Sequence, residues 1–394
     1  MVLIKNPGQK SLLILIFLLL VCLPSQLNAV VPKAQSLLQN MLTASKSLDY
    51  EGRLTLMAQD QTRNMVFELM VTRKAPDKRR IEIISPSEMA GSGFIINGND
   101  FSPLFPPNRE PNNNNKGPRG RGMFMPLFQP EQMDELQGYN IQQLLKNYKV
   151  RVLEGGFVAG RNTYLLEIDP RNSDRASRKI WVDKEKSIPL KTEQYNIQKV
   201  LQKLIAFSKI SFGMDISDDV FRIQRKLFDF GKQRKPPEHE ELWNQSQGGL
   251  DLDKIKEKAK FDATIPNILP GGLMLQSINM IKFDKNQNIH LRYTDGLTFI
   301  SVFQSPFDEA RRERERHEGP PPGGGPPGNP PGPPREPPKV EKMKILNIEC
   351  DIMQRGSDFI FRWYKGGVYF TMIGDYRKIE MIKMVGSIIK KEAT

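Results

Sequence analysis

An alternating stretch at residues 157–196 constrains the fold more than any other part of the chain. Tyr164, Leu166 and Ile168 fall on one face of an extended strand, while the residues between them fall on the other. Proline and polar residues end this strand, and two more strands follow at 179–182 and 190–195. The stretch contains no His, no Cys and no Gly-rich phosphate loop. It therefore predicts an antiparallel meander and indicates architecture, not catalysis.

The rest of the chain extends this pattern in both directions. Helices are predicted at 36–47, with Ser36 as N-cap, at 130–149 and at 378–391. In the last helix Ile379, Ile382, Val385, Ile388 and Ile389 are expected to face inward. Strands are predicted at 54–58, 65–71, 81–83, 93–96, 101–105 and 204–212, and then at 274–283, 290–293, 297–303, 343–353, 358–364 and 367–373. The fold class is α+β with antiparallel sheets.

Three segments are too polar or too rich in Pro and Gly to pack a core. Residues 108–125 are dense in Asn, Gly, Pro and Arg, and a solvated loop is favoured over a contact of Arg119 and Arg121 with an anionic lipid headgroup. Residues 228–249 read as a linker, followed by a helix start at 250–260. Residues 308–339 read as a disordered Pro/Gly-rich insertion. The predicted domains are accordingly 30–227 and 250–394.

The amino terminus predicts export. Lys5 and Lys10 precede an apolar run at 12–23, and Leu27-Asn28-Ala29 offers a cleavage site, so residues 1–29 are expected to be a signal peptide. An uncleaved anchor is the alternative. A lipoprotein signal at Cys22 is disfavoured because Val21 precedes it, where that signal needs a small residue. Cys350 is then the remaining cysteine, which excludes an intramolecular disulfide and reads as a small buried apolar residue.

Charge and titratable residues limit the classes of function. The 58 Lys and Arg against 45 Asp and Glu give a net charge of +13, spread along all 394 residues. This balance suits anionic lipid surfaces, lipopolysaccharide, nucleic acid or acidic protein segments, but a merely solvated basic surface is the favoured interpretation. The three histidines lie far apart in the sequence, so neither a metal site nor a catalytic triad is expected. We expect no enzyme activity and no cofactor.

Two sets of motifs resemble one family. Residues 34–225 carry RRIEIISP, GFIINGNDFSPLFPP and VLEGGFVAGRNTYLLEI, then a strand, a charged turn and a proline marked by Trp181, Asp183 and Pro189. This order resembles the LolA-type lipoprotein carriers and the amino-terminal domain of MucB/RseB proteins. The resemblance implies a curved antiparallel half-barrel whose concave apolar face is covered by lid helices. The loop at 108–125 is longer than the family usually carries.

The carboxy-terminal half resembles the second domain of the same family. The matching positions are Leu269, Pro270 and Gly272, then Tyr293, Asp295 and Gly296, followed by a late Gly-containing strand and a helix. Two domains in the family's order make the resemblance stronger than either domain alone. It implies a smaller α+β domain built on an antiparallel sheet.

The resemblance implies a periplasmic regulator of an envelope-stress sigma factor. Such a protein binds the extracytoplasmic segment of an anti-sigma factor and senses lipid or lipoprotein while remaining peripheral to the membrane. The alternative is a LolA-like carrier of lipids or lipoproteins, and nucleic acid is not an expected partner. Candidate residues for the apolar concave face alternate along two strands: Leu54, Leu56, Met65, Phe67, Leu69 and Val71. For any one of them plain core packing is the favoured interpretation. Which alternating set faces the cavity is not fixed by the sequence without the register.

Overall fold

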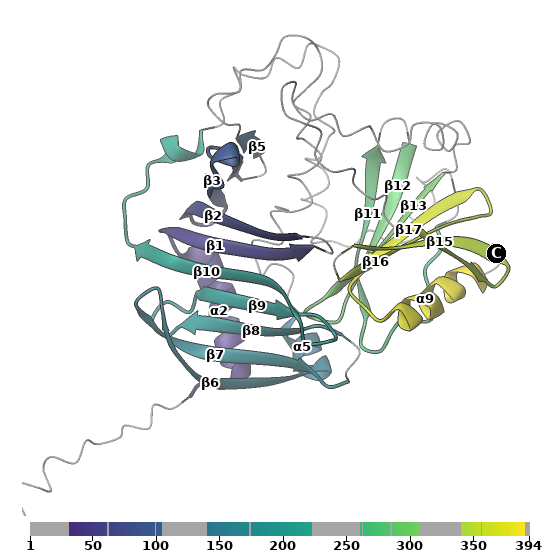
Figure 1. The fold of residues 1–394 in the computed structure, drawn as a ribbon, viewed down its shortest axis with the longest axis horizontal. Coiled ribbons are helices and arrows are strands. Elements are labelled where there is room, and N and C mark those ends of the chain that lie inside the picture. The colour runs from purple at the N-terminus through teal and green to yellow at the C-terminus, as the bar shows by residue number, and fades with distance from the viewer. Residues whose placement is uncertain are drawn as a thin grey trace, which may run out of the picture. The chain divides into compact units, whose positions relative to one another are not determined.

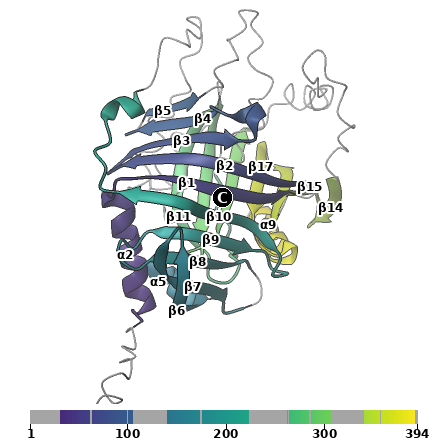
Figure 2. The same cartoon turned by 60° about the vertical axis from the view of Figure 1, so that its left-hand side comes forward.

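The first half of the chain forms a ten-stranded, fully antiparallel sheet in this computed structural model, which describes residues 31–60, 63–98, 100–104, 140–172, 175–222, 261, 263–283, 286–306, 340–355 and 357–390. The strand order is β5-β4-β3-β2-β1-β10-β9-β8-β7-β6 (Figures 1 and 2). The bounds are β1 Tyr50–Asp60, β2 Arg63–Lys74, β3 Lys78–Ser85, β4 Gly93–Asn97, β5 Asp100–Leu104, β6 Tyr148–Val158, β7 Arg161–Pro170, β8 Ser177–Asp183, β9 Pro189–Tyr195 and β10 Leu201–Phe212.

Two meanders meet at the centre of this sheet. Strands β1–β5 pair in chain order, as do β6–β10. The pairing of β10 with β1 joins the two meanders into one sheet. Along β7, Leu166 and Ile168 are buried on the inner face, as the alternation predicts. Within the described residues, β5 and β6 are paired on one side only. The predicted meander and the open, curved half-barrel are confirmed.

Helices cover part of the inner face. α2 (Ala34–Ser47) packs Leu37, Leu38 and Met41 against Leu166, Ile180 and Val182 of β7 and β8. The short α5 (Ile141–Asn147) joins the same cluster through the fully buried Leu144. The 3₁₀ turns η1 (Ser87–Met89) and η2 (Asp218–Phe221) complete this part. We call residues 33–222 the amino-terminal module.

Two helix boundaries differ from the sequence prediction. α2 begins at Ala34, and its N-cap residue is Lys33, which makes no side-chain cap hydrogen bond, so Ser36 is not the cap. α5 ends at Asn147, and Tyr148 already belongs to β6, whereas the periodicity predicts helix to Lys149. Tyr148 is fully buried. A buried residue at this position fits helical spacing as well as the start of a strand, so the periodicity includes it in the helix.

The second half of the chain forms a seven-stranded antiparallel sheet with order β11-β12-β13-β17-β16-β15-β14 (Figure 1). Its elements are β11 Met274–Phe283, β12 Asn286–Thr294, β13 Phe299–Pro306, β14 Val340–Ile345, β15 Ile348–Arg355, β16 Asp358–Lys365, β17 Val368–Gly374 and α9 Lys378–Lys390. Met381, Met384, Val385 and Ile388 of α9 pack on the buried residues of the sheet. We call residues 261–390 the carboxy-terminal module; together with the amino-terminal module it lies in one compact unit, residues 33–394.

Three sequence predictions for this module can be compared with the structure. The predicted strand 343–353 is a hairpin, because Leu346 and Asn347 adopt positive φ values of 47° and 68° and turn the chain between β14 and β15. Ile379 is 52% exposed, not inward, because it lies in the first turn of α9 on the solvent side. Cys350 is a free, buried cysteine, and burial raises the pKa of its thiol to about 11, which suits its predicted role as a small apolar residue.

Several predictions lie outside the described residues. These are the signal peptide 1–29, the loop 108–125, the linker 228–249 that separates the predicted domains, the helix start at 250–260 and the Pro/Gly-rich insertion 308–339.

Candidate functional site

All six predicted concave-face residues lie on one side of β1 and β2. The register pairs Leu54 with Leu69, Leu56 with Phe67 and Gly52 with Val71, so their side chains share the inner face. They belong to one apolar cluster that also contains Ile81, Ile83 and residues of β10. The side chains are therefore brought together, as the alternation of the two strands requires.

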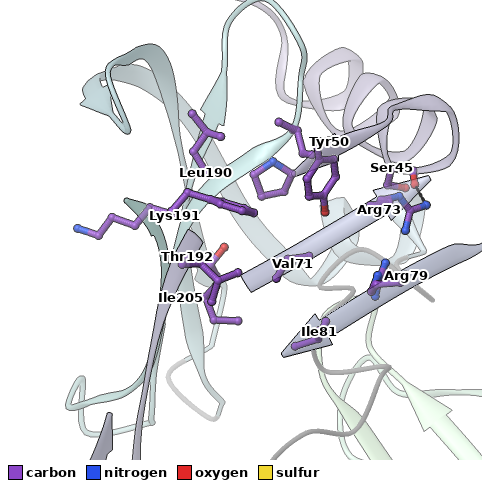
Figure 3. A pocket seen from close by; sticks show the side chains of 14 residues that line it. Ser45, Tyr50, Val71, Arg73, Arg79, Ile81, Leu190, Lys191, Thr192 and Ile205 are labelled. Atoms are coloured by element: carbon purple, nitrogen blue, oxygen red, sulfur yellow. Dashed lines mark hydrogen bonds between the residues drawn. The ribbon is translucent and has the colours of Figure 1, made fainter. Parts of the chain in front are cut away.

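A pocket opens at one end of this cluster, beside the C-terminal end of α2 (Figure 3). Of the six predicted residues, Leu54 and Val71 line it, and Leu56, Met65, Phe67 and Leu69 pack in the cluster instead. The complete lining is Ser45, Tyr50, Leu54, Val71, Arg73, Arg79, Ile81, Ile188, Pro189, Leu190, Lys191, Thr192, Ile205 and Phe207.

Two buried guanidinium groups interrupt the apolar wall of the pocket. Arg73 and Arg79 have exposed fractions of 5% and 8%. Arg73 Nη2 donates to the carbonyl oxygens of Ser45 and Pro76, which ties the pocket wall to the last turn of α2. The side chain of Lys191 points away from the cavity (Figure 3). Its Nζ lies 4.1 Å from the centroid of the Trp181 ring.

The size of the pocket limits what it holds in this state. Its volume of about 70 Å³ suits several water molecules, since one water needs roughly 10–15 Å³. A long acyl chain would require the surrounding side chains or α2 to move. Among the described residues, no group of three or more His, Cys, Asp or Glu side chains is placed to hold a metal ion.

A second cluster forms around Asp295, one of the family-signature positions. The side chain is fully buried, and both of its oxygens accept hydrogen bonds. Oδ1 accepts from the backbone N–H groups of Leu297 and Thr298 at 3.0 and 2.8 Å, which shapes the turn after β12. Oδ2 accepts from Tyr148 Oη at 2.8 Å, Arg175 Nη1 at 2.9 Å, Tyr376 Oη at 2.5 Å and Thr298 Oγ1 at 3.0 Å.

The partners of Asp295 come from both modules. Tyr148 and Arg175 belong to the amino-terminal module, whereas Tyr376 belongs to the carboxy-terminal module and forms an isolated antiparallel bridge with Arg175. Arg175 is 3% exposed, so its ion pair with Asp295 is buried. Burial and the nearby Asp295 charge raise the pKa of both Tyr148 and Tyr376, so both tyrosines donate as neutral hydroxyls.

The Leu-Pro-x-Gly positions lie at the same contact. Arg175 Nη2 donates to the Gly271 carbonyl at 2.6 Å, and Asn147 Nδ2 donates to the carbonyls of Gly272 and Asp295 at 3.0 and 2.8 Å. Gly272 has a φ of +85°, and a Cβ there would lie 2.2 Å from Asn147 Oδ1. Pro270 is buried and Leu269 packs against the carboxy-terminal core, as does Tyr293.

The signature positions on β8 and β9 are structural. Asp183 is fully buried and pairs with Arg161, and its Oδ1 accepts from the backbone N–H groups of Glu185 and Lys186 at 2.9 and 2.6 Å. Pro189 follows this turn and lines the pocket. Trp181 lies on the opposite face from Ile180 and is covered by Lys191. Sequence reasoning did not identify Arg175, Tyr148 or Tyr376 as members of a site.

No helix among the described residues has the length and apolar character needed to cross a membrane.

Comparisons with known proteins agree with this architecture. Residues 33–224 match the family model described as the MucB/RseB N-terminal domain. The fold is similar to the crystal structure of MucB in complex with MucA(peri), with a TM-score of 0.54 and 16% identity, covering 92% of this chain and 100% of that one. It is also similar to the Pseudomonas aeruginosa MucA/MucB complex structure, with a TM-score of 0.53 and 15% identity, covering 92% and 99%.

One curated relative is an uncharacterized protein, MJ0687, of Methanocaldococcus jannaschii. It is 25% identical over 170 residues, which is 42% of this chain and 43% of the relative. The match therefore spans less than half of the relative's length.

The family match covers the whole ten-stranded sheet, and the fold similarity continues through the seven-stranded sheet. Residues 33–224 therefore match the MucB/RseB N-terminal domain family, and the fold of the chain is similar to that of MucB over both modules.

Proposed function

We propose that this chain is an exported, non-enzymatic regulator that binds the extracytoplasmic segment of a membrane-bound anti-sigma factor. The observation that carries the proposal is the fold similarity over both modules to MucB crystallised with MucA(peri), which covers 92% of this chain. A carrier of the LolA type would not need the carboxy-terminal module. In this proposal the protein acts outside the cytoplasm and is peripheral to the membrane.

The pocket supports a second part of the proposal, the sensing of lipid, lipopolysaccharide or acylated protein. Its lining combines apolar residues such as Leu54, Val71 and Phe207 with the buried cations Arg73 and Arg79. An amphiphile with an anionic end matches that combination, because the tail is removed from water while the charge is paired. The same pocket is the observation that favours the alternative, a carrier of lipids or lipoproteins.

Partner binding is tested by native mass spectrometry of the tagged full-length protein purified from its own cell envelope. A stoichiometric single-pass membrane protein, absent from a control purification of an unrelated tagged envelope protein, is the expected result. Bound lipid or acylated peptide with no such protein would favour the carrier. Sequencing of the purified amino terminus tests export, with Val30 expected as the first residue.

Ligand binding is tested separately with a fluorescent fatty acid and the variant Val71→Trp. The indole is expected to fill the pocket and weaken binding at least tenfold. The matched control is Leu153→Trp on β6, because Leu153 is 42% exposed and lies outside the pocket. Equal binding by both variants would place any lipid site elsewhere.

A further inference from the structure

One leucine of the carboxy-terminal module is buried in the core of the amino-terminal module. Leu297 follows β12 and is 2% exposed, and its cluster consists otherwise of residues from α2, α5 and strands β6, β7 and β8. The other members of that cluster include Leu37, Met41, Leu144 and Tyr148. The covering of the inner face at α2 and α5 is therefore completed by the turn at residues 294–298.

Hydrogen bonds hold this turn through both the side chain and the backbone carbonyl of Asp295. Asp295 receives hydrogen bonds from Tyr148 and Arg175, and Asn147 donates to the Asp295 carbonyl. Gln143 of α5 donates to the Gly272 carbonyl, so the loop before β11 is held as well. The contact thus joins α5 to two separate loops of the carboxy-terminal module.

Polar groups make up much of the contact, so its opening would expose groups that water solvates. When the turn withdraws, Asp295 and Arg175 regain water, and that hydration offsets much of the lost ion pair. A purely apolar contact would have no such compensation. Leu144 and Tyr148, both fully buried here, would then face solvent with the rest of the α5 surface. α5 has seven residues, too few for an isolated helix, so it depends on this packing.

We propose that the turn 294–298 is an intramolecular plug, which closes the inner face of the amino-terminal sheet at α2 and α5 and exposes an apolar groove there when it is released. The plug goes beyond the proposed function, because it requires neither an anti-sigma factor nor a natural lipid.

Hydrogen exchange of the full-length chain without its signal peptide tests the plug, together with binding of the apolar dye 1-anilinonaphthalene-8-sulfonate. The variant is Arg175→Gln, which removes the ion pair from the amino-terminal side and leaves the turn's own hydrogen bonds to Asp295 intact. The expected result is at least fivefold faster exchange at 141–147 and 294–298 together, unchanged exchange in β8 and β16, and increased dye binding.

The matched control is Glu341→Gln, which breaks an exposed ion pair with Lys378 within the carboxy-terminal module. It should change neither exchange in the two segments nor dye binding. Tyr148→Phe is the second variant, because it removes one hydrogen bond and keeps the ring, so it should give a smaller change of the same kind. Unchanged exchange in Arg175→Gln, or faster exchange without added dye binding, would overturn the plug.

Discussion

Gly296 lies so close to Leu144 that a Cβ on residue 296 would be 2.3 Å from the Leu144 backbone nitrogen. Gly296 belongs to the turn that follows β12 in the carboxy-terminal module, and Leu144 belongs to α5 in the amino-terminal module. Gly296 also has a φ of +101°, which side-chain-bearing residues rarely adopt. The approach of the turn to the helix therefore depends on glycine twice, for its backbone conformation and for its lack of a side chain.

The substitution Gly296→Ala should separate the modules. Strain alone costs about 1–2 kcal/mol, and displacing the Leu144 backbone adds roughly 1–3 kcal/mol. Gly367→Ala is the control, because Gly367 has a φ of +79° with nothing within 4 Å of an added Cβ. Urea denaturation should show the larger loss for Gly296→Ala. Equal losses would mean that backbone conformation alone requires the glycine.

Asp375 should contribute a loss of stability as the pH rises toward 7. Burial, with contributions from the Asp358 and Asp295 charges, raises its pKa from 3.8 to about 7 despite Ser357 and Arg178, which lower it. Asp375 Oδ2 is buried without a hydrogen-bond partner among the described residues. Below pH 3.8 this carboxyl is protonated in both the folded and the unfolded protein, and its contribution to stability is most favourable. Between pH 3.8 and about 7 it ionises only in the unfolded protein, so stability is lost. Above about pH 7 the folded carboxyl is charged and buried.

The expected loss from this carboxyl between pH 4 and 7 is roughly 1–4 kcal/mol. Asp375→Asn should flatten this part of the profile, measured by urea denaturation at each pH. Asp169→Asn is the control, because Asp169 lies on β7 in ion pairs with Arg151 and Lys199. A steep profile that survives in Asp375→Asn would assign the pH dependence to another group.

The hydroxyl of Tyr148 should contribute more to stability than that of Tyr195. Tyr148 donates to a fully buried carboxylate, and such a hydrogen bond is worth about 1.5–3 kcal/mol. Tyr195 donates to the partly exposed Glu193 on its own strand, so Tyr195→Phe should cost less than about 1 kcal/mol. Thermal and urea unfolding of the two Phe variants measure the difference. Similar losses would show that Asp295 is satisfied by its other donors.

Most of the predicted concave-face residues should behave as core. Leu69 is fully buried and does not line the pocket, so Leu69→Ala should cost about 2–5 kcal/mol. Leu153→Ala on β6 should cost less than about 1 kcal/mol, since that side chain is 42% exposed. Chemical denaturation compares them. A small loss at Leu69 would mean that the inner face tolerates a cavity and is better suited to hold a ligand.

Local pattern was sufficient for most of the strands. Alternation located the meander around Tyr164 and the inner face of β1 and β2, because a strand's two faces meet different surroundings. It failed where the signal was ambiguous. The apolar run at 345–353 hides the turn at Leu346 and Asn347, which contains neither Gly nor Pro, and Tyr148 fits helical spacing although it begins β6.

The site around Asp295 could be predicted only in part. Resemblance singled out Asp295, Gly296 and Gly272, yet it did not say what they contact. Arg175 lies 120 residues away from Asp295 in the sequence, and a pairing over that distance leaves no periodic trace. In the sequence, Arg175 follows a short polar stretch, which predicts a solvent-exposed arginine. Its burial depends on the tertiary fold.

The division of labour between the two oxygens of Asp295 has an entropic consequence. The bonds of Oδ1 to Leu297 and Thr298 lie within the turn, so they order it without requiring a contact with the other module. A turn ordered in this way loses little further conformational freedom when it packs against α5. Replacing the carboxylate would remove the acceptor for Tyr148 and Arg175. It would also remove the order within the turn that keeps the loss of conformational entropy small when the modules join.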